Sequence, residues 1–128
     1  MDIAENLKLY WHDVITQNAN SLKNHFLPNA YIRWNNTNEQ FTVAEFIIAN
    51  CTYPGEWSGE IQRMEIVQST AITVTRVWLS DNSLSFHVTS FFEFEQGKIA
   101  VLNEYWGDDG NPPQWRLDKH IGKRIKST

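Results

Sequence analysis

The chain has 128 residues, with 11 Lys and Arg against 15 Asp and Glu, and 41% of its residues are hydrophobic. A chain of this length forms one domain with its own hydrophobic core and has no room for a second core. The single cysteine excludes an internal disulfide framework, and no Cys or His spacing matches a zinc site. The net charge of −4 argues against a nucleic-acid partner, for which a basic face is typical.

Neither a membrane span nor a secretory signal is expected. No apolar run approaches ~18 residues, the length that a membrane helix needs. The first residues, MDIAENLKLYWHD, carry acidic side chains instead of the apolar stretch of a signal peptide. We therefore expect a cytoplasmic protein with no membrane partner.

The first part of the chain is predicted to be mainly helical. Apolar residues recur at three- and four-residue steps over 3–15, which indicates a first helix. A second, short helix is expected over 20–27, followed by a strand over 30–34 where the side chains alternate. Thr42-Val43-Ala44-Glu45 has the pattern of a capping box and predicts a third helix that reaches Asn50.

The second part is predicted to be a run of antiparallel strands. Short turn-forming segments separate the four expected strands, which cover 58–68, 70–79, 84–95 and 98–106. Three helices and one early strand, followed by a long meander, predict an α+β domain whose curved sheet wraps its helices. This domain is expected to span residues 1–106.

The tail, residues 107–128, differs in charge from the domain. It carries five Lys and Arg against three Asp and Glu, whereas residues 1–106 carry six against twelve. Two interpretations remain open. The tail either folds back on its own acidic domain or extends from it as an arm that binds a partner.

The last hairpin predicts which side chains face the inside of the sheet. Gly97 indicates a three-residue loop with Phe94 opposite Lys98. Residues directly opposite each other share a face, so one set points to the concave side: Phe86, Val88, Ser90, Phe92, Phe94, Leu102, Glu104 and Trp106. The outer set is His87, Thr89, Phe91, Glu93, Val101, Asn103 and Tyr105. If the preceding hairpin also has an odd loop, Arg76 joins Glu104 on the inner side.

The order of elements resembles that of the NTF2-like superfamily. The segment Phe92-Glu93-Phe94-Glu95-Gln96-Gly97-Lys98-Ile99, followed by Glu104-Tyr105-Trp106, is similar to the closing hairpin of its SnoaL-like and ketosteroid-isomerase-like members. The resemblance spans residues 3–106. It implies a cone-shaped α+β barrel with N-terminal helices packed in the concave face, an apolar pocket at the open end, no cofactor, and a homodimer formed through the outer sheet face.

The catalytic residues of these relatives carry over only in part. In ketosteroid isomerase, a tyrosine of the first helix and a protonated aspartic acid form the oxyanion hole, and a second aspartate is the base. Tyr10 stands where the tyrosine is expected, but Ser90 and Trp34 stand at the two aspartate positions. Steroid isomerisation by that mechanism is therefore not expected. In SnoaL-like cyclases the acid/base carboxylate lies five residues after the isoleucine of G-x-I, and Glu104 has this position relative to Ile99.

The candidate catalytic residues are therefore Glu104, Tyr10 and Arg76. If Arg76 pairs with Glu104, the carboxylate stays ionised and serves as a base, an anchor or only a structural ion pair. Without that partner, burial raises its pKa and favours proton transfer near neutral pH. Tyr10 is either a core aromatic residue or a ligand contact. The candidate ligand-binding residues are Trp34, Asn50, Phe86, Val88, Ser90, Leu102 and Trp106.

Three classes of function follow. The first is a cofactor-independent isomerase, cyclase or hydratase of the SnoaL-like kind that uses Glu104 as acid/base. The second is a module that binds a small hydrophobic molecule without chemistry, since an apolar pocket with few polar groups suits such a ligand. The third is a dimeric interaction domain, which we expect only if aromatic side chains fill the cone.

Overall fold

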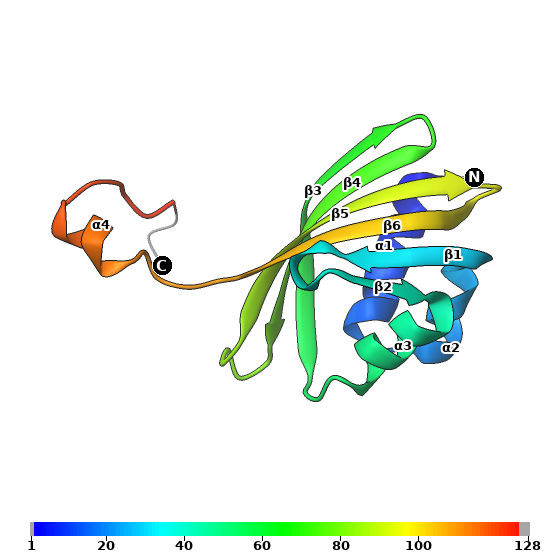
Figure 1. Ribbon diagram of the computed structural model, residues 1–128, viewed down its shortest axis with the longest axis horizontal. Coiled ribbons are helices and arrows are strands. Elements are labelled where there is room, and N and C mark those ends of the chain that lie inside the picture. Colours follow the sequence, from blue (N-terminus) through cyan, green and yellow to red (C-terminus); the bar gives the residue numbers. More distant parts are fainter. Residues whose placement is uncertain (1, 126–128) are drawn as a thin grey trace.

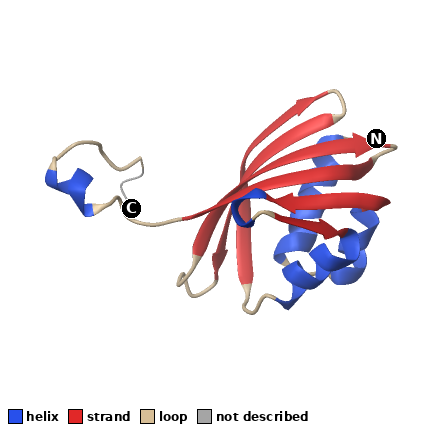
Figure 2. Cartoon of the chain, viewed as in Figure 1, coloured by secondary structure: helices blue, strands red, loops and turns tan. Residues whose placement is uncertain are grey.

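The computed structural model describes residues 2–125, in which the helices come first and most of the sheet follows (Figures 1 and 2). The helices and 3-10 turns are α1 (Ile3–Ile15), α2 (Ala19–Leu22), η1 (Lys23–His25), η2 (Asn35–Thr37), α3 (Val43–Thr52) and α4 (Gln114–Asp118). The strands are β1 (Phe26–Trp34), β2 (Glu39–Thr42), β3 (Trp57–Val67), β4 (Thr70–Leu79), β5 (Ser85–Glu95) and β6 (Lys98–Asp108).

Side-chain caps explain where the two longer helices begin. The carboxylate of Asp2 accepts hydrogen bonds from the backbone N–H groups of Ala4 and Glu5 at the start of α1. At the start of α3, Thr42 and Glu45 form the predicted capping box, each side chain bonding to the backbone of the other residue. These bonds satisfy N–H groups that lack a partner within the helix.

The strands form one curved, mixed sheet in the order β2-β1-β6-β5-β4-β3. β1 runs parallel to β6, and all other neighbours are antiparallel. Helices α1, α2 and α3 lie together against one face of the sheet, as Figure 1 shows. The predicted α+β architecture, with N-terminal helices in the concave face, is confirmed.

The region between α2 and α3 differs from the expectation. The second helix ends at Leu22, and β1 begins at Phe26, so residues expected to be helical start a strand. The pairing of β1 with β6 is interrupted between Phe26 and Tyr31. Pro28 lies in this interval and has no backbone N–H, so its presence removes no hydrogen bond between the two strands. The short strand β2 was not predicted; it has four residues and pairs only with β1.

The closing hairpin has a shorter loop than predicted. Glu95 lies opposite Lys98, and the two loop residues, Gln96 and Gly97, have φ values of 52° and 77°. Positive φ at both positions is typical of a type I′ turn, which matches the twist of the strands. A bulge at Ala100 then adds one residue to β6, so that Phe92 pairs with Leu102 instead of Ala100.

The loop and the bulge together shift the predicted pairing by two residues beyond the bulge, which leaves residues 101–106 on their predicted faces. Before the bulge the faces are reversed, so that Ile99 is buried opposite Phe94 and Lys98 is exposed. Val88, Ser90, Phe92, Leu102 and Glu104 are all buried, with exposed fractions of 0% or 1%. On the other face, Phe91 and Tyr105 are 39% and 48% exposed. The inner and outer assignment is therefore confirmed for β5 and for residues 101–106 of β6.

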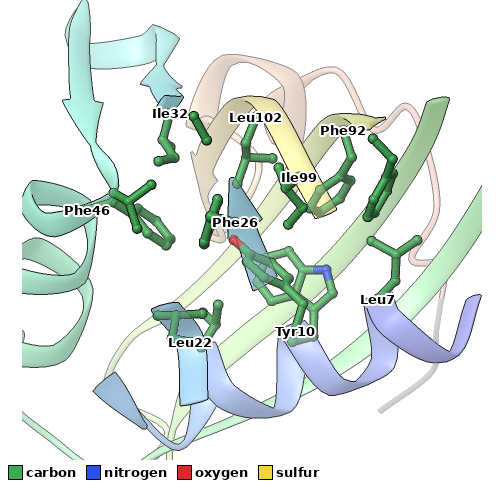
Figure 3. Packing of buried hydrophobic residues seen from close by; sticks show 14 of the residues in the cluster. Leu7, Tyr10, Leu22, Phe26, Ile32, Phe46, Phe92, Ile99 and Leu102 are labelled. Carbon is green, nitrogen blue, oxygen red and sulfur yellow. The ribbon is translucent and has the colours of Figure 1, made fainter. Parts of the chain in front are cut away.

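The hydrophobic core lies between α1 and the inner face of the sheet. Leu7 and Tyr10 of α1 point toward Phe92, Ile99 and Leu102 of the sheet, as Figure 3 shows. The Tyr10 ring makes edge-on contacts with four other rings: Trp11, His25, Phe26 and Phe92. Large rings therefore fill most of this half of the cone, which leaves only a small pocket of about 170 Å³ beside Tyr10 and His25.

The segment after β6 leads away from the body of the molecule and contains the short helix α4 (Figure 1). Its apolar residues Trp115 and Ile121 are 62% and 61% exposed. Both interpretations of the tail stay predictions; residues 126–128 lie outside the described part. No helix within residues 2–125 is long and apolar enough to cross a membrane.

Candidate functional site

A cavity of about 650 Å³ occupies the end of the cone that the core leaves open. It lies between the ends of α1 and α3 and the ends of the strands β1, β3, β4, β5 and β6. The lining residues are Val14, Ile15, Gln17, Trp34, Asn36, Thr37, Ala49, Asn50, Thr52, Tyr53, Pro54, Trp57, Val77, Phe86, Trp106 and Asp108. Most of this lining is aromatic or aliphatic, which suits an apolar ligand.

Aromatic rings form one continuous wall of the cavity. The ring centroid of Phe86 lies 5.9 Å from that of Trp57 and 6.3 Å from that of Trp106. The Trp106 ring in turn lies 6.2 Å from Trp34. Phe86 and Trp106 share the inner face because they belong to the alternating inner set of β5 and β6. Such rings offer large apolar area with little conformational entropy to lose on binding.

Two polar side chains, Asn50 of α3 and Gln17 of the turn after α1, border the cavity and connect the segments around it. Asn50 donates to the backbone carbonyl of Val14 at 3.1 Å, which ties α3 to α1. Gln17 donates to the carbonyl of Asn50 at 2.9 Å and to that of Tyr53 at 2.6 Å. Asn50 therefore lines the cavity and also ties the two helices together.

A buried carboxyl group, Glu104, lies on the inner face of β6. Its side chain is 1% exposed. The hydroxyl of Ser90 donates to Oε2 at 2.7 Å, and the indole N–H of Trp34 donates to Oε1 at 3.1 Å. Both partners come from strands next to β6, Ser90 on β5 and Trp34 on β1, and both are directly opposite Glu104 in the register. The sheet itself thus positions this group.

Burial controls the ionisation of this region. It raises the pKa of Glu104 to about 7, although the hydrogen bonds from Ser90 and Trp34 act in the opposite direction. The buried hydroxyl of Tyr10 has no hydrogen-bond partner among the described residues. Burial, and the negative charge of Glu104, raise the pKa of Tyr10 well above its usual range. Near neutral pH, Glu104 therefore exists in both protonation states and Tyr10 stays neutral.

Glu104 and Tyr10 do not line the cavity. Neither is among the lining residues, whereas Trp34 lines the cavity and also bonds to Glu104. The indole of Trp34 thus stands between the carboxyl group and the open space. In this arrangement a ligand in the cavity would contact Trp34 and not the carboxyl group itself.

The predicted ligand-binding residues fall into two groups. Trp34, Asn50, Phe86 and Trp106 line the cavity. Val88, Ser90 and Leu102 lie deeper in the cone, are 0% exposed, and have no contact with the open space. Val88 and Leu102 belong to the same packed core as Tyr10 and Trp11 of α1, and the strand alternation alone does not reveal this packing.

Arg76 lies on the outer face of the sheet, against the expectation that it points inward. The β4–β5 loop contains four residues, because Leu79 bonds to Leu84, and this even number reverses the predicted face of β4. Arg76 consequently lies opposite His87, and its guanidinium stacks 4.6 Å from the Trp78 ring centroid. Its ion-pair partner is Asp109, at 3.6 Å, and not Glu104.

Sequence reasoning missed several residues at the open end. Trp57 and Tyr53 line the cavity. Their positions on either side of the loop after α3 could have indicated that they lie at the open end of the cone. Asp108 was missed because the last strand was expected to end at Trp106. In the structure β6 continues to Asp108, since the backbone N–H of Asp109 still bonds to the carbonyl of Ser85 at 3.0 Å.

No metal centre is apparent within the described part of the chain, where no three His, Cys, Asp or Glu side chains lie together as ligands. His87 lies on the outer face, as its place in the alternation predicted, and its ring contacts the Asp109 carboxylate. His25 contacts the buried Asp13, with 2.6 Å between Nε2 and Oδ2. Both histidines thus belong to local polar clusters outside the cavity.

Comparison with solved structures identifies the fold. A candidate ketosteroid isomerase from Kribbella flavida DSM 17836 is 18% identical, with a TM-score of 0.78 over 96% of this chain and 89% of that one. An NTF2-like protein of unknown function from Burkholderia xenovorans LB400 is 20% identical, with a TM-score of 0.77 over 97% and 95%. A candidate polyketide cyclase from Sinorhizobium meliloti is 15% identical, with a TM-score of 0.64 over 78% and 93%.

These likenesses show that the chain has the NTF2-like fold, as the resemblance of its closing hairpin implied. No protein-family model matches the sequence, and no curated protein matches it significantly. The structural relatives include proteins described as isomerases and cyclases, so the fold is compatible with several activities.

Proposed function

We propose that this protein binds a small, largely apolar organic molecule in the cavity at the open end of the cone. The observation that carries the proposal is the lining: about 650 Å³ of space bordered by the rings of Trp34, Trp57, Phe86 and Trp106. Cavities of about 300–1,000 Å³ with mostly apolar walls are the usual size of sites for small molecules. The third class of function, a cone filled by its own side chains, is less favoured because this space remains open.

A cavity-filling substitution tests the proposal. Ala49 lines the cavity from α3, whereas Ala44 lies on the exposed side of the same helix. We expect Ala49→Phe to abolish binding of the neutral fluorescent probe N-phenyl-1-naphthylamine, because the new ring occupies the site. Ala44→Phe adds the same ring to the same helix outside the cavity and should bind the probe as the native protein does.

Circular dichroism of both variants would confirm that the fold is retained. Equal binding of the probe by Ala49→Phe and the native protein would place the probe elsewhere and contradict the proposal. Loss of binding in both variants would mean that α3 responds to any added ring, and would contradict it too.

Proton-transfer catalysis by Glu104 is the second candidate, and its pKa near 7 is the specific observation that favours it. A carboxyl group that titrates near the working pH can act as acid or base. With Trp34 displaced, Glu104 would exchange a proton with a bound substrate, and Ser90 and Tyr10 would stay as polar neighbours. Such chemistry would belong to the isomerase or cyclase type of some structural relatives.

Glu104→Gln separates the two candidates. If the protein is an enzyme, this variant should still bind the probe but lose turnover of a substrate found by screening by about 10²–10⁴-fold, the usual share of general acid–base catalysis. Glu93→Gln, a similar change on the outer face, should leave turnover unchanged. Full turnover by Glu104→Gln would show that Glu104 is structural.

A further inference from the structure

The charge of the cavity lining restricts the kind of ligand. Of its lining residues only Asp108 is charged, and no Lys, Arg or His is among them. The Asp108 carboxylate has no hydrogen-bond or ion-pair partner within residues 2–125. The cavity therefore presents an apolar, aromatic wall with one unneutralised negative charge.

Asp108 stands beside the centre of the aromatic wall. It lies directly opposite Phe86 in the β5–β6 register, so the two side chains leave the sheet on the same face. Phe86 is also the ring between Trp57 and Trp106, within 5.9 Å and 6.3 Å of their centroids. A group near Phe86 would thus meet the carboxylate on one side and π-systems on the others.

The neighbouring residue holds Asp108 in this orientation. Successive side chains of a strand point to opposite faces, so Asp109 points outward. There its carboxylate contacts Ser85, His87 and Arg76, and its pKa is lowered because these contacts outweigh the effect of burial. Arg76 and His87 are thus both engaged on the outer face by Asp109.

We propose that the cavity selects a ligand with an organic cation, an alkylated ammonium group attached to an apolar body; this inference rests on the proposed binding function. The faces of indole and phenyl rings attract cations, and an alkylated ammonium loses less hydration than a primary one when it enters such a site. The ammonium group would lie between the Phe86 wall and the Asp108 carboxylate. An anionic group would meet Asp108 without any cation to neutralise it, and its burial would be costly.

Two probes of the same shape test this inference. Phenyltrimethylammonium and tert-butylbenzene differ only in a positively charged nitrogen in place of a carbon. Each is titrated as a competitor of N-phenyl-1-naphthylamine on the native protein, on Asp108→Asn and on Glu93→Gln. Glu93→Gln removes a negative charge from the outer face and serves as the matched control.

We expect the cation to compete better than its neutral isostere on the native protein. Asp108→Asn should weaken the cation about fivefold, the effect of one partly exposed charge next to aromatic faces, and should leave the isostere unchanged. Glu93→Gln should change neither. Equal competition by the two probes, or equal loss of both in Asp108→Asn, would overturn the inference while the apolar site stands. Failure of N-phenyl-1-naphthylamine itself to bind the native protein would instead contradict the proposed function.

Discussion

Glu104 couples the ionisation of a single side chain to the stability of the fold. Its carboxyl group has lost water but keeps two hydrogen-bond donors, Ser90 and Trp34. Those two bonds recover only part of the lost hydration, so the folded protein holds the proton more tightly than the unfolded chain does. The neutral form of Glu104 is therefore the one that the fold favours.

The stability of the protein should accordingly depend on pH through this residue. Because the pKa rises from 4.5 to about 7 on folding, the folded state binds more protons between these values. The contribution is fully present below pH 4.5 and is lost as the pH rises through 7, by on the order of 3 kcal/mol. Glu104→Gln cannot ionise at this position. As the pH rises from 4 to 8, the free energy of unfolding of the native protein should therefore fall by this amount relative to that of the variant.

Urea unfolding of both proteins across this range measures the difference, and the other titrating groups cancel in the comparison. A difference that stays constant with pH would mean that the pKa of Glu104 is the same in the folded and unfolded states, and would contradict its elevation by burial.

The inner place of Glu104 was predictable because it depends only on whether the loop and bulge add an odd or even number of residues. In place of the predicted three-residue loop, the structure has a two-residue loop and a one-residue bulge. The number of extra residues is odd in both cases, so Glu104 keeps its predicted face. The predicted inner place of Arg76 was wrong for the same reason. The loop between β4 and β5 has four residues, an even number, whereas the prediction assumed an odd number. The division between core and cavity was not predictable, because it depends on how far the rings of α1 reach into the cone.

At the scale of elements, α1 approaches β3 closely where a glycine makes room. A Cβ atom on Gly59 would lie 2.9 Å from Cγ1 of Ile15 and closer still to its Cδ1. The end of α1 can therefore pack directly against the strand, and Ile15 can at the same time line the cavity. The order of helices and strands was predictable from periodicity and caps, but this contact between distant segments was not.

Gly59→Ala should destabilise the fold by about 1–3 kcal/mol, the usual effect of an overpacked contact. The far end of the Ile15 side chain must shift, or α1 must move outward. In an Ile15→Ala background both crowding atoms are absent, so Gly59→Ala should cost much less there. Thermal or urea unfolding of the four proteins of this cycle measures the coupling. An equal cost of Gly59→Ala in both backgrounds would contradict the close approach.

For the whole molecule, we propose a homodimer formed through the outer sheet face. Phe91 and Tyr105 are exposed there and pack edge to face, with centroids 5.9 Å apart. An exposed apolar surface of this kind is commonly covered by a second copy. The proposal agrees with what the resemblance to NTF2-like proteins implied.

Phe91→Asp should convert a dimer into a monomer of 15.0 kDa, because a charge in the centre of the interface would be buried without a partner. Ile48→Asp, at an exposed position of α3, is the control and should keep the dimer. Light scattering after gel filtration gives both masses. A native protein that is monomeric at micromolar concentration would refute the assembly without affecting the cavity.

The two ends of the cone thus have different roles. Core aromatic residues such as Tyr10 and Phe92 close the narrow end, whereas Trp57, Phe86 and Trp106 surround open space at the other. Because the packed half supports the sheet, the open half can keep a cavity without loss of the fold. The central claim is that this cavity is a binding site.

The most direct test is a crystal structure of the protein with N-phenyl-1-naphthylamine bound. We predict density for the probe inside the cavity, in contact with Phe86 and at least one of Trp57 and Trp106, with Glu104 still bonded to Ser90. Density for the probe on the outer sheet face near Phe91, or a cavity closed by the indole rings themselves, would contradict the account.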